Sequence, residues 1–243
     1  RFLYQTIVSY GSLVATQRAL TSASIDNACD ELITGYTYYK WLKQQESTPM
    51  DFTVFGDVCK RVFGSDNAVI SITNDNADAF EQNAQSFVSS LDKSDFSHEL
   101  KIKLSKPKNE GIIIPGDIAF SGMGAALSNA YNGASCLACH IASYDYLWNE
   151  VRVKGGAYGC GVRVNTNGTF GANSFRDPNA PQSVKTFRGI SDYLRELAQS
   201  DRSLTGFIIG AMSAQNPLLT PKTAANISNM NYFKKITQEQ RRK

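Results

Sequence analysis

The stretch Ala157-Tyr-Gly-Cys-Gly-Val-Arg-Val-Asn-Thr-Asn-Gly-Thr-Phe-Gly-Ala-Asn-Ser-Phe175 carries the clearest structural signal of the sequence. It predicts two strands, at 157–166 and 169–175, joined by Asn167-Gly168, a dipeptide that supplies the positive φ angles of a tight hairpin turn. Asp177-Pro178-Asn179 then ends the second strand. The sequence therefore predicts a β-hairpin in this region.

Helical patterns lie on both sides of the hairpin. Apolar residues recur at helical spacing over 132–152, with Leu137, Ile141, Tyr144 and Trp148 on the apolar side, and again over 183–198. Further helices are expected at 23–46, 51–63, 77–91, 203–214 and 222–233, and further strands at 68–73, as a buried strand, and at 117–123. Because strands do not alternate strictly with helices, this order indicates an α+β sandwich.

The composition is that of an ordinary globular protein. Of the 243 residues, 42% are hydrophobic and 19% are charged, which argues against disorder. No apolar run approaches the roughly 20 residues of a membrane-spanning helix, and the basic residues are too scattered for a nucleic-acid footprint. Neither a membrane nor a nucleic acid is therefore expected as a partner. The five cysteines leave the compartment open, with a reducing one, the cytoplasm, preferred.

A polar segment divides the chain. From 92 to 110 the sequence is rich in lysine and interrupted by proline, as in a linker, so we expect two parts, 1–104 and 105–243. The sequence begins at Arg1 without a signal-peptide pattern and ends within the start of a further helix at Thr237. Both ends indicate a part of a longer protein.

The segment Arg152-Val153-Lys154-Gly155-Gly156-Ala157-Tyr158-Gly159 joins the helix at 132–152 to the first hairpin strand. It resembles the Arg-x-x-Gly-Gly-Ala-Tyr-Gly run in the last domain of the pitrilysin/insulinase superfamily of inverted zinc proteases, in its presequence-protease-like branch. Asn173-Ser174-Phe175-Arg176-Asp177-Pro178-Asn179 is similar to a Ser-Tyr-Arg-Asp-Pro-Asn run of that branch, with Phe175 in place of the tyrosine. Residues 31–39 are similar, more loosely, to the end of the preceding domain.

The resemblance covers nearly the whole chain. It implies a mostly antiparallel sheet packed against helices, the fold that these proteases repeat. It also implies that 1–104 is the C-terminal portion of the third protease domain, and that 105–243 is the fourth and last domain.

The same resemblance implies roles for Arg152 and Tyr158. The two side chains would reach across a closed chamber to a peptide held against the zinc domain, and donate hydrogen bonds to its carbonyls or to the developing oxyanion. Gly155, Gly156 and Gly159 would let the backbone leave the helix sharply and let another chain approach closely. Taken singly, Arg152 would be a capping residue at a helix C-terminus, and Tyr158 a half-buried strand aromatic.

Arg176 and Asp177 follow the hairpin directly. A local ion pair and turn at the hairpin exit accounts for them without any substrate. We therefore expect a structural role for both.

The zinc motif of this family is absent from the sequence. An inverted His-x-x-Glu-His helix places two histidines on one helical face, with a glutamate that activates water. The chain has only His98, in the polar linker, and His140, and neither has a matching partner. The resemblance therefore maps to the non-catalytic half, with no complete catalytic set, no metal site and no cofactor in this chain. Zinc is expected in an N-terminal half of the same polypeptide, and a peptide as substrate.

Two other functions stay open. The first is a structural or assembly module without a catalytic contribution. The second is a haem- or metal-binding domain, because Cys136-Leu137-Ala138-Cys139-His140 matches the Cys-x-x-Cys-His signature of c-type haem attachment, and Cys160 could complete a zinc site. Against the second, the motif lies inside the predicted helix 132–152, where cysteine fits as a small apolar residue. Gly122-x-Gly124 does not complete a dinucleotide-binding fingerprint.

Overall fold

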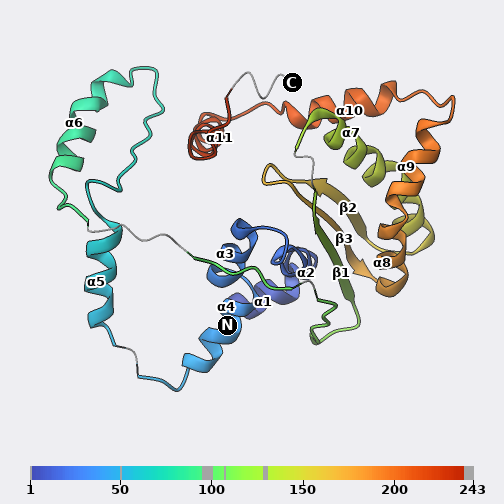
Figure 1. Cartoon of the computed structure of the whole chain (residues 1–243), viewed down its shortest axis with the longest axis horizontal. Coiled ribbons are helices and arrows are strands. Elements are labelled where there is room, and N and C mark those ends of the chain that lie inside the picture. Colours follow the sequence, from blue (N-terminus) through green and yellow to red (C-terminus); the bar gives the residue numbers. More distant parts are fainter. Residues whose placement is uncertain (1, 50, 95–100, 107, 128–130, 238–243) are drawn as a thin grey trace. The chain divides into compact units, whose positions relative to one another are not determined.

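The computed structural model describes residues 2–49, 51–94, 101–106, 108–127 and 131–237 (Figure 1). The chain divides into two compact units, one of Arg1–Ser47 with Ile102–Asn216 and one of Thr48–Lys101 with Pro217–Lys243. The first unit holds the sheet. Among the described residues, no helix is both long enough and apolar enough to cross a membrane.

The sheet has three antiparallel strands. These are β1 (Ala119–Ala126), β2 (Gly159–Val164) and β3 (Thr169–Asp177), in the order β1-β3-β2. The predicted hairpin is confirmed: Gly168 has a φ of +75°, and the Asn165 amide donates to the Thr169 carbonyl at 2.8 Å. With helices packed against this sheet, the α+β fold is confirmed as well.

The helices of the first unit are α1 (Phe2–Ser9), α2 (Gly11–Leu20), α3 (Ile25–Ile33), α4 (Tyr36–Gln45), α7 (Gly133–Ile141), the π-helix η1 (Ala142–Lys154), α8 (Ala180–Arg188), α9 (Ile190–Ala198) and α10 (Thr205–Gln215). Helices α1 and α2 were not predicted from the sequence. The helix expected at 23–46 is two helices that part at Gly35, and the one expected at 183–198 is two that part at Gly189. A side chain at Gly189 would meet the Tyr146 hydroxyl, 2.5 Å from the added Cβ.

The second unit contains α5 (Thr53–Val62), α6 (Asp78–Ser89) and α11 (Pro221–Phe233), all three close to their predicted bounds. The buried strand expected at 68–73 is wrong, because these residues form no strand and Val69 and Ile70 are exposed. A strand forms only where its backbone groups find partners. The described residues offer this segment none.

One face of the sheet carries the hydrophobic core. Helix η1 and helix α8 pack there, so that Leu147 and Val151 of η1 lie buried with Ala172 of β3 and Phe187 of α8. In addition, the Ser143 hydroxyl accepts from the Val162 amide at 3.0 Å, which ties η1 to β2. Figure 1 shows α7, α8 and α9 on this side of the sheet and α1 to α4 on the other.

The long helix predicted over 132–152 changes its winding on the way. It begins at Asn132, whose side chain caps it through the Ser135 amide, and continues as η1 from Ala142. A π-helix has more residues per turn than an α-helix. The buried face therefore runs through Ala142, Leu147 and Val151, whereas Tyr144 and Trp148, predicted as apolar contacts, are exposed.

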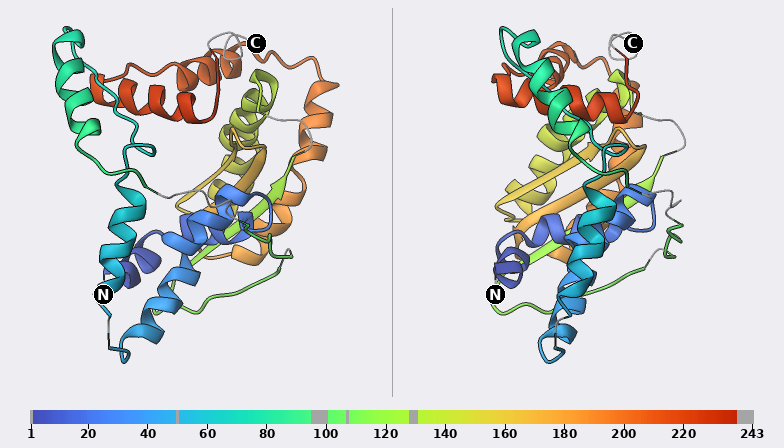
Figure 2. Two further views of the ribbon diagram at one scale, coloured as in Figure 1. Left: turned by 60° about the vertical axis from the view of Figure 1, so that its left-hand side comes forward. Right: turned by 90° about the vertical axis from the view of Figure 1, so that its left-hand side faces the viewer.

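Helix α2 lies on the opposite face of the sheet. Successive residues of a strand point to opposite faces, and Gly171 of β3, the neighbour of the core residue Ala172, faces Thr16 of α2. Figure 2 shows the same layers from two further sides. The helix backbone touches the strand backbone: a Cβ placed on Gly122 would lie 2.5 Å from the Ala15 carbonyl carbon and the Thr16 nitrogen. Gly122 and Gly124 thus serve helix packing.

We expect Gly122→Val to lower the free energy of unfolding by about 1–3 kcal/mol, because the new side chain forces α2 away from β1. Urea denaturation followed by circular dichroism measures the change. Gly111→Val is the matched control, since nothing lies within 4 Å of a Cβ added there. Equal unfolding midpoints for the two variants would contradict the proposed packing.

Candidate functional site

The junction between η1 and β2 is held by backbone geometry. The Gly156 amide donates to the Arg152 carbonyl at 3.0 Å, and the Ala157 amide donates to the Val151 carbonyl at 3.1 Å. Gly156 has a φ of +80°, and a Cβ on Gly155 would lie 2.5 Å from the Val151 oxygen. Both positions therefore require glycine, whereas a Cβ on Gly159 would make only an ordinary contact, 3.8 Å from Phe175.

Tyr158 lies directly before β2. Its amide is shared between the carbonyls of Phe175 and Arg176, at 3.1 and 3.2 Å, so its backbone is fixed to the end of β3. The side chain is 69% exposed, and its ring meets the Phe175 ring edge-on with 6.0 Å between centroids. No hydrogen bond between described residues uses the Tyr158 hydroxyl.

Arg152 lies in the last turn of η1. Its guanidinium carbon lies 3.9 Å from the centroid of the Trp148 ring, one turn earlier on the same helix, which makes a cation–π contact. Within the described part of the chain, no ion pair involves Arg152. The stacked face of the guanidinium leaves its N–H groups, which lie in the plane, free to donate.

A half-buried thiol, that of Cys160, lies beside this junction. Burial raises the pKa of Cys160 to about 11, while the charge of Arg152 lowers it and that of Asp177 raises it. The thiol is therefore neutral at physiological pH. Arg152 and Asp177 both lie near enough to act on it.

Arg176 and Asp177 lie at the hairpin exit. Arg176 is exposed, with a φ of +46°, and its guanidinium carbon lies 5.6 Å from the Phe175 centroid. Asp177 is fully buried, and its Oδ1 accepts from the Asn179 amide at 2.7 Å. Among the described residues, Oδ2 of Asp177 has no hydrogen-bond partner, and no ion pair joins it to Arg176.

Arg152 and Tyr158 thus flank the same glycine junction. The Arg152 guanidinium stacks on Trp148 of its own helix, whereas the Tyr158 ring contacts Phe175 of the neighbouring strand β3. Their joint use of one substrate chamber stays a prediction.

The Cys-x-x-Cys-His motif lies on α7, and its side chains serve packing. Burial raises the pKa of the Cys139 thiol to about 11, and this residue packs against the hydrophobic core. The His140 ring lies 4.7 Å from the Tyr144 ring, and its Nε2 fills the space where Gly210 lacks a Cβ. Among the described residues, no three His, Cys, Asp or Glu side chains gather where they could hold a metal ion. His98 lies outside the described residues.

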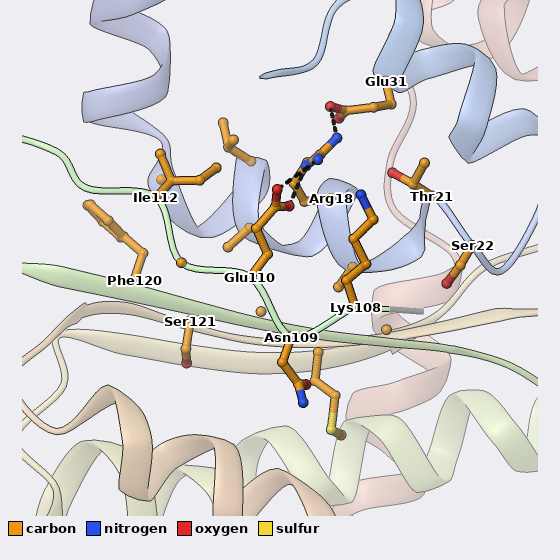
Figure 3. Close-up of a pocket in the computed structure, with 18 of the residues that line it drawn as sticks. Arg18, Thr21, Ser22, Glu31, Lys108, Asn109, Glu110, Ile112, Phe120 and Ser121 are labelled. Carbon is orange, nitrogen blue, oxygen red and sulfur yellow. Dashed lines mark hydrogen bonds and ion pairs between the residues drawn. The ribbon is translucent and has the colours of Figure 1, made fainter. Parts of the chain in front are cut away.

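Sequence reasoning missed a large cavity of the first unit, of about 1250 Å³. It is lined by α2, by β1 and by residues of the segments 102–106 and 108–114, and it contains an ion-pair network (Figure 3). Arg18 donates to Glu31 at 2.7 Å and to both carboxylate oxygens of Glu110, at 2.8 and 3.0 Å. The Thr37 amide also donates to Glu31 at 2.7 Å.

Glu31 is the least exposed member of this network, at 1%. Its Oε2 has no hydrogen-bond partner within the described part of the chain. The signal that could have identified Glu31 from the sequence is its spacing: it follows Ala28 by three residues, and both are buried on the same side of α3. Arg18 and Glu110 are 92 residues apart, and no local pattern links them.

The Arg18–Glu110 contact predicts a pH-dependent stability. The hydrogen bond from Arg18 holds the pKa of Glu110 below its usual value, against a smaller opposing effect of burial. A lowered folded-state pKa stabilises the fold above the unfolded-state pKa of about 4.3, and this contribution is lost as the pH falls through the folded-state value.

We therefore expect Glu110→Gln to lower the free energy of unfolding at neutral pH, and the difference from the native chain to shrink as the pH falls below about 4.3. Urea denaturation across this pH range measures it. Glu46→Gln is the control, because Glu46 forms an exposed pair with Lys43, and such pairs contribute little. A difference that is the same at every pH would argue against the contact.

Comparisons with known proteins place these features in a family. Residues 109–243 match the family model of the PreP C-terminal domain. Protein HypA of Clostridium perfringens is 29% identical over 243 residues, covering 96% of this chain and 25% of HypA. Presequence protease 1 of Arabidopsis thaliana, chloroplastic/mitochondrial, is 31% identical over 140 residues, covering 56% of this chain and 13% of that protein. The mitochondrial presequence protease of Kluyveromyces lactis is 26% identical over 192 residues, covering 74% and 19%. The chain spans a quarter or less of the length of these relatives.

Proposed function

Because this chain belongs to the family of the PreP C-terminal domain, we propose that it is the non-catalytic C-terminal part of a zinc-dependent peptidase. It encloses and binds a peptide, which an N-terminal half with a His-x-x-Glu-His motif on the same polypeptide cleaves. The greater length of the presequence proteases that it matches supports such a half. In this proposal residues 1–104 end the third domain, and residues 105–243 form the fourth.

The junction at 152–158 carries the proposal. Two hydrogen-bond donors flank a glycine turn, one on the last turn of a packed helix and one directly before a paired strand. Donors on rigid elements need little reorganisation when a substrate arrives, and they act most strongly where water is excluded.

Each donor is accessible in a way that suits a peptide. The Trp148 ring supports one face of the Arg152 guanidinium and leaves its N–H edge free for a carbonyl oxygen. The Tyr158 hydroxyl lies on a side chain that is 69% exposed, supported at its ring by Phe175. We infer that the two side chains donate hydrogen bonds to carbonyls of the bound peptide, or to the oxyanion that forms on cleavage.

We expect Arg152→Ala and Tyr158→Phe, each made in the full-length peptidase, to lower kcat/KM for peptide cleavage by about 10²–10³-fold. This is the usual effect of removing one such donor. A fluorogenic peptide assay measures the rates, and the 243-residue chain alone is expected to cleave nothing.

The control is Arg163→Ala, because Arg163 is an exposed arginine of β2, the strand that follows Tyr158. The variants should unfold at the same urea concentration as the native protein, since Arg152 and Tyr158 are not core residues. Unchanged peptide turnover in both variants would contradict the substrate-binding role of Arg152 and Tyr158.

A purely structural module is the second candidate. It is favoured by the contacts of Arg152 with Trp148 and of Tyr158 with Phe175, since both are made within the chain itself. In that case the two substitutions change stability, and leave turnover equal to that of the Arg163→Ala control.

A further inference from the structure

Strand β1 has an unpaired edge. In the order β1-β3-β2, β3 is paired on both sides, whereas β1 pairs with β3 alone among the described residues. Because β1 and β2 both run antiparallel to β3, they are parallel to each other and are connected through α7 and η1. This arrangement is one split β-α-β unit.

A second unit of the same kind starts at β3. Helix α8 follows β3 and packs on η1 and β1, on the same face of the sheet as the first connection. Connections between parallel strands of one sheet are right-handed. If the chain crosses this face after β3 in the right-handed sense, the next strand joins the sheet on the far side of β1, as in the β-α-β-β-α-β arrangement. The place of the returning strand is therefore the free edge of β1.

The backbone groups at that edge can be identified. The Leu127 amide donates to the Gly168 carbonyl at 2.8 Å, and from there the register with β3 is regular back to Ser121. Since alternate residues of an antiparallel strand point to alternate sides, Met123 and Ala125 bond to β3, and the amides of Gly122, Gly124 and Ala126 point to the free edge.

The large cavity lies along this edge. Its walls come from both faces of the sheet, with Ala15 and Ala19 of α2 on one side and Pro181 and Val184 of α8 on the other. Residues of the segments 102–106 and 108–114 line it further, as Figure 3 shows for Lys108, Asn109 and Glu110. Among the described residues, no backbone hydrogen bond joins 102–114 to β1.

The charges of the cavity favour an acidic occupant. The basic side chains that line it include Lys40, Lys103, Lys106, Lys108 and Arg188. Its two carboxylates, Glu31 and Glu110, are already bound to Arg18. The lining therefore carries a positive excess that an acidic side chain would neutralise.

We propose that the free edge of β1 takes up a fourth strand, antiparallel to β1 and carrying acidic side chains, which is supplied by the polypeptide outside residues 1–243. The relatives are about four times as long as this chain or longer, so such a segment has a source. An open strand edge is also a place where proteins pair with the wrong chain unless it is covered. The edge lies opposite β2, the strand that begins beside Tyr158, so this strand is independent of the peptide proposed to bind there.

Amide hydrogen exchange of β1 tests the proposal in the 243-residue chain and in the full-length polypeptide. We expect the amides of Gly122, Gly124 and Ala126 to exchange about 100-fold more slowly in the full-length polypeptide. Met123 and Ala125 are internal controls, because β3 protects them in both samples. Equal rates at the three edge amides would overturn the proposal, as would protection that appears only when a substrate peptide is added.

Charge reversal gives a second measurement. In the full-length polypeptide, Lys106→Glu with Lys108→Glu should raise the exchange rates of the three edge amides at least about tenfold and leave those of Met123 and Ala125 unchanged. The matched control is Lys60→Glu with Lys222→Glu, two exposed lysines that do not line the cavity. Identical edge-amide rates in the two double variants would overturn the acidic character of the strand.

Discussion

The packing of η1 against the sheet, chiefly against β2, is the contact on which the rest of the first unit depends. Leu147 and Val151 are at most 1% exposed, and they share one buried core with Val162 of β2 and Ala172 of β3. Full burial of one such side chain contributes about 1.5–3 kcal/mol. The same contact fixes the glycine junction, because the Val151 carbonyl accepts the amide that begins the path into β2. Arg152 therefore takes its position from its buried neighbour, and Tyr158 takes its own from the strand beyond.

The parts that the sequence could predict are those that local chemistry dictates. Asn167-Gly168 specifies the hairpin, and the glycine run at 155–156 marks the point where the helix ends, so both were found. The π-helical winding of η1 could not be found from an α-helical period. Beyond Ala142 the residues that are buried differ from those expected on the apolar face: Leu147 is buried in place of Trp148. Trp148 lies at the surface, where its ring stacks on Arg152.

Long-range contacts and missing neighbours account for the other differences. The Arg18 network joins residues of α2, α3 and the segment before β1. No local sequence pattern in any of these segments predicts which residues it contacts. In the second unit the three helices were predicted, but apolar side chains of these helices are exposed, as at Phe55 and Val58 on α5. Large exposed apolar patches commonly mark surfaces that pack against another part of a protein or against a partner. The chain spans a quarter or less of the length of its relatives, and in the proposed longer protein such side chains would pack against other parts of the polypeptide.

The two edges of the small sheet serve different purposes in the proposed protein. The junction leading into β2 presents an exposed phenol and a stacked guanidinium, which are groups that bind a ligand reversibly. Strand β1 has backbone glycines pressed against α2 and a deep cavity with excess positive charge, which suits a permanent neighbour. A strand held on β1 would brace α2 and α8 from between them. Since α8 also packs on η1, that strand would stiffen the helix whose end carries Arg152, so covering one edge would help to fix the donors at the other.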